Sequence, residues 1–167
     1  MIRSPIVACH PCRAAQGPQR PECRRLPAAE SRAVGTITNP HDVYAFLSPK
    51  SWRLKHERAW LLLLSSAYLL VNVGEIGRGG PSEVEVDLDW ALSCVRLPET
   101  PYAVLSHNHP NGAAWPSTDD VELTRAMQRA AARQRVTLLD HVVLGRDEYF
   151  SFHEGQLWQV TRTRTRS

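Results

Sequence analysis

Long apolar segments are missing from this sequence of 167 residues. A membrane-spanning helix needs about 18 consecutive apolar residues, whereas the longest apolar run here is AWLLLL at residues 59–64. The first residues, MIRSPIVACHPCRAA, also lack the apolar core of a secretory signal peptide. We therefore expect neither a membrane span nor a signal peptide, and we interpret the run at 59–64 as a buried strand.

A basic surplus is missing from most of the chain, although the formal net charge is +3. Residues 1–33 contain six Arg and two acidic residues, whereas residues 34–167 contain 14 Lys and Arg against 15 Asp and Glu. Three of those Arg lie in the terminal TRTRTRS. A nucleic-acid-binding domain usually carries a basic face on the domain itself, so the bulk charge gives DNA binding little support.

Cysteine is scarce, with four residues in the chain. Cys9, His10, Cys12 and Cys23 match a zinc knuckle only in part, because His10 lies inside the CxxC and no convincing fourth ligand is present. We therefore interpret these cysteines as unpaired thiols in a tail, and Cys94 as a small buried hydrophobic residue of a helix. Such cysteine usage favours a reducing cytoplasm.

The chain divides into a tail, one domain and a second short tail. Residues 1–33 are rich in Pro, Arg, Ala and Gln without an apolar period, so we expect them to be disordered and dispensable. Residues 161–167 form a basic tail, and residues 34–160 are predicted to form one α/β domain of the α+β type, with a single mixed sheet flanked by helices. Three helices are predicted: one that starts at Asn39-Pro40 and ends before Pro49, one over 86–97 and one over 117–135. Five strands are predicted, over 58–66, 67–77, 102–106, 136–145 and 148–158, of which the first two form a hairpin.

Two histidines end the predicted strand at 102–106, in the stretch SHNHPNGAAWPSTDD. In an extended segment, side chains two residues apart point to the same side, so His107 and His109 can both face one point while Asn108 faces away. Zn²⁺ accepts imidazole nitrogens at about 2.0–2.1 Å. His107 and His109 would therefore supply two of the four ligands of a tetrahedral zinc site.

A carboxylate at the start of the next helix can supply a third ligand. Ser117 is a natural N-cap, and Asp120 follows at the third helical position, whose side chain faces back towards the cap. Asp119 is the rival ligand, and we prefer Asp120 for this reason. Two His and one Asp would leave a fourth position for water, as in catalytic zinc sites. The stretch contains no obvious residue to carry a proton.

This pattern of His107-x-His109-Pro110, then Ser117 and Asp120, resembles the JAMM motif of the JAB/MPN metalloproteases, and most closely their RadC-like branch. The segments LLDHVVLG at 138–145 and EYFSFHEGQLW at 148–158 also resemble that branch, so that the resemblance covers about residues 36–158. It implies a JAB/MPN-like fold with cytidine-deaminase-like layering. It also implies a Zn²⁺ ion bound by the two His and the Asp.

The same resemblance implies two catalytic residues. Ser117 would stabilise the oxyanion, and Glu57, just before the long apolar strand, would be the general base. The chain departs from the family at Ser65-Ser66, where an Asp is usual, and at DLDW, residues 87–90, where a PRE-like helix start is usual. These departures leave all five proposed site residues in place.

Other residues remain open as site candidates. From the residues alone, Glu75 at the end of the second strand is an alternative base. Asp140 and His141 face opposite sides of a strand, and one of them is a candidate partner of a ligand. Trp115 lies between the ligands and either lines a substrate groove or covers the core.

The resemblance, taken together with the residues above, implies a soluble, cytoplasmic zinc hydrolase that cleaves peptide or isopeptide bonds with a metal-activated water. Its partners would be peptide or protein substrates, without a membrane. Two alternatives remain: a RadC-like protein that binds DNA or a repair partner, and a metal-bound interaction module without turnover.

Overall fold

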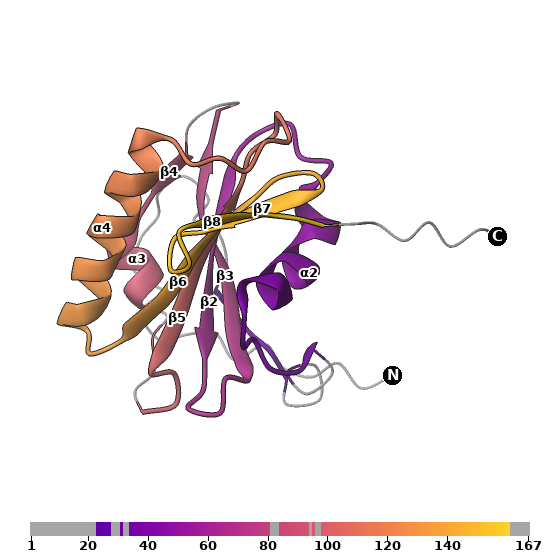
Figure 1. Ribbon diagram of the computed structural model, residues 1–167. Helices are drawn as coiled ribbons and strands as arrows, with labels where there is room; N and C mark the ends of the chain where they lie inside the picture. Colours follow the sequence, from indigo (N-terminus) through magenta and orange to yellow (C-terminus); the bar gives the residue numbers. More distant parts are fainter. Residues whose placement is uncertain are drawn as a thin grey trace, which may run out of the picture.

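The computed structural model describes residues 23–27, 31, 34–80, 84–93, 95 and 98–160. Figure 1 shows one twisted sheet with helices against both faces, which confirms the predicted α+β class. In the described part of the chain the sheet order is β1-β3-β2-β5-β6-β7-β8, with β4 paired to β3. The strands are β1 (Cys23–Arg25), β2 (Arg58–Leu64), β3 (Leu70–Gly79), β4 (Val84–Val86), β5 (Tyr102–Asn108), β6 (Thr137–Leu144), β7 (Glu148–Ser151) and β8 (Gln156–Gln159).

The parallel pair β5 and β6 places the functional region of the fold. These strands are joined by helix α4 (Thr118–Arg133), because parallel neighbours need a crossover connection. Since both strands run in the same direction, their carboxyl ends lie together at one edge of the sheet. The segment that returns from β5 therefore starts α4 close to the end of β5, and this brings residues 107–109 and 117–120 together.

The apolar run at residues 59–64 is buried on both faces, as its continuous hydrophobicity predicts. Ala59, Leu61 and Leu63 pack in a core with α3 (Leu88–Ser93) and α4. The alternate residues Trp60 and Leu62 pack in a second core with α2 (Pro40–Ser51). The three helices thus cover the two hydrophobic faces that this strand presents, and Figure 1 shows α2 on one side and α3 and α4 on the other.

Several predicted boundaries need correction. Helix α2 begins at the Asn39 cap as expected but continues through Pro49 to Ser51. Because proline has no N–H, the carbonyl of Ala45 loses its hydrogen-bond donor within the helix. Ala45 is exposed, so water can replace that donor. The strand predicted at 148–158 is a hairpin of β7 and β8, because the chain turns at 152–155, where Gly155 has a φ of 64°. The helix predicted at 86–97 is described only as α3, and Cys94 lies outside the described residues.

The expectation of a disordered tail over 1–33 is wrong for the residues that the structure describes there. β1 pairs with Asn72–Gly74 of β3, and Leu26 is 5% exposed in the core beside α2. The Ser31 hydroxyl donates to the Leu70 carbonyl at 2.5 Å. An unpaired edge of β3 offers backbone donors and acceptors to any extended segment, so this pairing requires no apolar pattern. Residues 1–22, with Cys9 and Cys12, lie outside the described residues.

A chain shortened to residues 34–167 is therefore expected to melt at a lower temperature than one that begins at residue 23. The shorter chain loses β1 and the burial of Leu26, which alone contributes about 2–3 kcal/mol. For a domain of this size, that loss lowers Tm by roughly 5 °C or more. Calorimetry on both chains measures it, and equal melting temperatures would show that β1 adds no stability.

No helix in the described part of the chain is long and apolar enough to cross a membrane.

Candidate metal centre

The end of β5 presents His107 and His109 on the α4 side of the sheet. The Nε2 atoms of the two rings lie 3.0 Å apart. The extended backbone continues past the strand, because the His109 N–H donates to the Leu144 carbonyl of β6 at 2.9 Å. The chain then turns back at Gly112, whose φ of 90° favours glycine. This turn lets His109 Nδ1 donate to the Ala113 carbonyl at 2.8 Å, which leaves Nε2 as a lone-pair donor.

Asp120 completes the cluster from the first turn of α4. Its Oδ1 lies 2.9 Å from His107 Nε2, and its Oδ2 lies 3.4 Å from His109 Nε2. The capping box aims this carboxylate, because the Ser117 N–H and hydroxyl both donate to Oδ2 at 2.7 Å. Asp119 is exposed, and no ligand cluster in the described residues includes it. The geometry thus favours Asp120 over Asp119 as a ligand.

The three side chains fit a divalent metal in geometry and in charge. Adjacent ligands of a tetrahedral zinc ion lie about 3.4 Å apart when each bond is about 2.1 Å. The two Nε2 atoms lie 3.0 Å apart, and each lies 2.9–3.4 Å from one oxygen of the Asp120 carboxylate. Burial lowers the pKa of His107 and keeps its ring neutral. Burial opposes ionisation of Asp120, but the close contacts of its carboxylate with the His107 and His109 rings outweigh it and hold the pKa of its carboxyl far below the usual range.

The pKa of His109 is shifted in the opposite direction from that of His107. Burial acts to lower the pKa of His109, but the hydrogen bonds with Asp120 and Ala113 outweigh it, so that the net shift is upwards. A metal ion must displace a proton from the His109 ring, so the affinity of the cluster for a metal is expected to fall as the pH falls.

Glu57 lies at the amino end of β2, opposite His109. β2 and β5 are antiparallel with Ala59 opposite His107, and an extension of this register by two residues would place Glu57 beside His109. Glu57 shares the side of Ala59, which faces α4, and it is 5% exposed. Its carboxylate is one of the charges that raise the pKa of His109. The structure thus places Glu57 close enough to His109 for its charge to act on that ring, while its role as base stays a prediction.

Asn108 is a site residue that sequence reasoning missed. Its side chain faces away from the ligands, as alternation requires, but its Oδ1 accepts from the Arg58 N–H at 2.9 Å. Its Nδ2 donates to the His56 carbonyl at 3.3 Å. The Asn108 amide therefore holds the backbone on both sides of Glu57. Its signal in the sequence was a polar residue between two histidines of a strand, and it is only 3% exposed.

The alternative base Glu75 lies on the other side of the sheet. It pairs with Trp60, whose side chain packs with α2, and its neighbour Ile76 packs with α3 and α4. Its carboxylate forms ion pairs with Arg58 and Arg78. This position separates Glu75 from the metal ligands.

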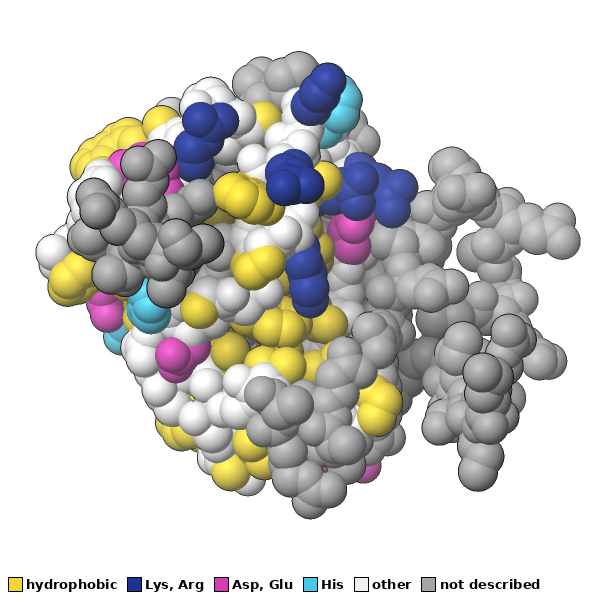
Figure 2. Space-filling model, turned by 90° about the vertical axis from the view of Figure 1, so that its right-hand side faces the viewer, with side chains coloured by type: hydrophobic (Ala, Val, Ile, Leu, Met, Phe, Trp, Pro, Cys, Tyr) yellow, Lys and Arg dark blue, Asp and Glu magenta, His cyan; other side chains and the backbone are white. Residues whose placement is uncertain are grey.

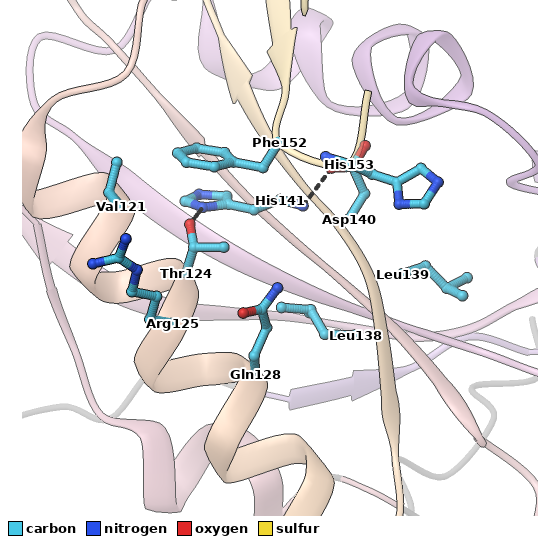
Figure 3. Close-up of a pocket in the computed structure, with 10 residues that line it drawn as sticks. All are labelled: Val121, Thr124, Arg125, Gln128, Leu138, Leu139, Asp140, His141, Phe152 and His153. Carbon is cyan, nitrogen blue, oxygen red and sulfur yellow. Dashed lines mark hydrogen bonds between the residues drawn. The ribbon is translucent and has the colours of Figure 1, made fainter. Parts of the chain in front are cut away.

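Of the two candidates on β6, His141 is the one that contacts a ligand. Its Nε2 lies 2.8 Å from His107 Nδ1, and its ring stacks on Phe152 with centroids 4.9 Å apart. Figure 3 shows this ring between Phe152 and Thr124, beside a cavity of about 250 Å³. Burial lowers the pKa of His141 well below its usual value. Asp140 points the other way and accepts from the Ser151 hydroxyl and the His153 N–H.

Trp115 remains largely in solvent. Its side chain is 67% exposed and contacts Phe150 edge to face, with ring centroids 5.5 Å apart. Such exposure gives little support to the interpretation that Trp115 covers the core.

Comparison with known proteins agrees with this geometry. The model of the RadC-like JAB domain matches residues 37–157. The chain belongs to the RadC-like JAB domain family. The relatives of this RadC-like domain include UPF0758 proteins from Porphyromonas gingivalis (34% identical over 130 residues, 77% of this chain and 57% of the relative) and Actinobacillus succinogenes (30% over 131 residues, 78% and 60%). Another, from Carboxydothermus hydrogenoformans, is 32% identical over 122 residues, 72% of this chain and 53% of the relative.

The RadC-like domain thus spans little more than half the length of these curated relatives. One departure from the family pattern lies far from the cluster. Ser65 forms the turn between β2 and β3, where its hydroxyl oxygen accepts from the N–H groups of Ala67 and Leu69. This turn follows the carboxyl end of β2, whereas Glu57 precedes its amino end. The second departure, at 87–90, contains the start of α3.

If Ser117 stabilises an oxyanion, as the resemblance implies, Ser117→Ala is expected to keep a bound metal and to lower kcat by about 10²–10³, as removal of one oxyanion donor does. It also removes the N-cap of α4, which costs about 1 kcal/mol of stability. Metal analysis, steady-state kinetics and thermal melting separate the two effects. Normal turnover with reduced stability would leave Ser117 as a capping residue alone.

Proposed function

We propose that this RadC-like domain is a zinc-dependent hydrolase that cleaves peptide or isopeptide bonds. The observation that carries the proposal is the convergence of the buried His107 and Asp120 with the partly buried His109, near the buried Glu57. Zinc sites with three protein ligands and an open position are typical of hydrolases rather than of structural zinc modules.

The residues of the chain have distinct roles in such a reaction. A bound Zn²⁺ supplies a Lewis acid that polarises the scissile carbonyl and lowers the pKa of water to about 7. Glu57 accepts the proton of the attacking water and donates it to the leaving amine. Ser117, at the exposed start of α4, would redirect the hydroxyl proton that it donates to Asp120 Oδ2 in this structure and donate it to the oxyanion. Asp120 stays ionised, which balances part of the charge of the metal.

Metal analysis combined with amide hydrolysis tests this function. The purified protein is expected to bind about one zinc per chain and to cleave members of a fluorogenic peptide library or a set of lysine-linked isopeptides. A chelator should abolish cleavage, and added Zn²⁺ should restore it, but not in Asp120→Ala. One zinc per chain without cleavage of either substrate class would instead favour a metal-bound interaction module.

DNA binding is a second candidate, supported by one local feature. Lys50, Arg53 and Lys55 are exposed at the end of α2 and in the loop after it, and Figure 2 shows Lys and Arg side chains gathered on this face. Polyanion binding by such a surface weakens steeply with salt. Salt-dependent binding of duplex DNA that is lost in the charge-reversed Lys50→Glu, Arg53→Glu, Lys55→Glu protein would support it. Equal binding by both proteins would exclude this surface.

A further inference from the structure

A closed ring of contacts connects two of the metal ligands behind the metal position. His107 Nδ1 lies 2.8 Å from His141 Nε2, and His141 Nδ1 lies 2.6 Å from Thr124 Oγ1. Thr124 Oγ1 in turn lies 2.6 Å from the backbone carbonyl of Asp120. Figure 3 shows the Thr124 hydroxyl directed at the His141 ring, with Phe152 on the opposite side. The contact between Asp120 Oδ1 and His107 Nε2 closes this ring of contacts.

The Thr124 hydroxyl fixes the direction of these hydrogen bonds. A hydroxyl has one proton, and a carbonyl can only accept. The Thr124 proton must therefore be donated to the Asp120 carbonyl, since two acceptor oxygens would otherwise face each other at 2.6 Å. His141 must then donate from Nδ1 to Thr124 Oγ1, and its Nε2 is left as an acceptor. His107 consequently donates from Nδ1 to His141.

The side of this ring of contacts that faces His109 and Asp120 requires the same direction of hydrogen bonding. His107 Nε2 faces His109 and Asp120, so this atom must present a lone pair if the cluster binds a metal. A neutral imidazole with a lone pair on Nε2 carries its proton on Nδ1, which is the atom that faces His141. The directions deduced from the two ends agree, and each of the three side chains contributes one proton.

We propose that Thr124 and His141 are positioning residues that hold His107 in the tautomer and orientation required for metal binding. The proposal rests on the metal site of the proposed function but not on hydrolysis. Both side chains are well suited to the task, because Thr124 is 6% and His141 1% exposed, and the stack on Phe152 restricts rotation of the His141 ring. The ring also ties the first turns of α4 to β5 and β6, so that His107 and Asp120 are positioned together.

Metal affinity of paired variants tests the proposal. Thr124→Val keeps the shape of the side chain but removes the hydroxyl, and His141→Leu removes the acceptor for His107. Both are expected to weaken Zn²⁺ binding by about 10–100-fold in competition with a chelator, as loss of such supporting partners does. Thr124→Ser and His141→Gln, which retain a hydroxyl and an acceptor, should recover most of the affinity.

Ser106→Ala provides a matched control. Ser106 is also fully buried, its hydroxyl donates to the Val142 carbonyl at 2.7 Å, and it adjoins His107 without joining the ring. This variant should lose stability but keep the metal affinity of the wild type. If it lost as much affinity as Thr124→Val, general loosening of the sheet would explain both, and the proposal would be wrong.

Nitrogen-15 NMR of the zinc-loaded wild type gives a direct readout. Long-range nitrogen–hydrogen correlations should show the proton on Nδ1 of both His107 and His141. A proton on Nε2 of His141, or wild-type affinity in both Thr124→Val and His141→Leu, would overturn the inference. So would failure of the wild type to bind Zn²⁺, whereas zinc binding without amide cleavage would contradict only the hydrolase.

Discussion

Glu57→Gln is expected to reduce kcat by about 10²–10⁴ while zinc content and fold stay near those of the wild type. Gln keeps the size of the side chain but cannot take a proton from water. The Asn108 side chain bonds the backbone of residues 56 and 58, and the backbone of Glu57 bonds that of residues 79 and 80. These hydrogen bonds do not use the Glu57 side chain, so they survive the substitution. Steady-state kinetics and metal analysis of the same preparation measure the effect.

Glu75→Gln is the control for this experiment, because Glu75 is also a carboxylate on a neighbouring strand but faces α2. Its turnover should be close to that of the wild type. An inactive Glu75→Gln together with an active Glu57→Gln would mean that the base is Glu75 of β3 and not Glu57.

His107→Ala and Asp120→Ala are each expected to remove most of the bound zinc, while Asp119→Asn keeps it. Each Ala variant deletes one of three converging ligand atoms, whereas the Asp119 side chain is exposed outside the cluster. Zinc per chain after dialysis against a weak chelator is the measurement. Equal losses in Asp119→Asn and Asp120→Ala would mean that the wrong carboxylate had been chosen.

Periodicity predicted the elements of this domain well, and for a physical reason. A strand buried on both faces must be apolar at every position, and the run at 59–64 has no other simple interpretation in a chain of this kind. β1 could not be found in this way, because an edge strand is held by backbone hydrogen bonds that any side chain permits. The extent of α2 past Pro49 depended on solvent at one carbonyl, which the sequence does not encode.

The site shows the same division. His107, His109, Ser117 and Asp120 are close in sequence, so alternation in a strand and capping of a helix sufficed to bring them together. The position of Glu57 came from resemblance, because no local rule sets the register between β2 and β5. The contacts of Asn108 and Thr124 depend on which strands are neighbours, and they became visible only in three dimensions.

The β5–α4–β6 crossover also has a consequence for folding. All three metal ligands lie within residues 107–120, whereas Glu57 reaches them only after strands fifty residues apart have paired. Closing the longer loop costs about 1 kcal/mol more chain entropy, and pairings distant in sequence form late. We therefore expect the candidate ligands of residues 107–120 to come together earlier in folding than Glu57 comes to lie beside them.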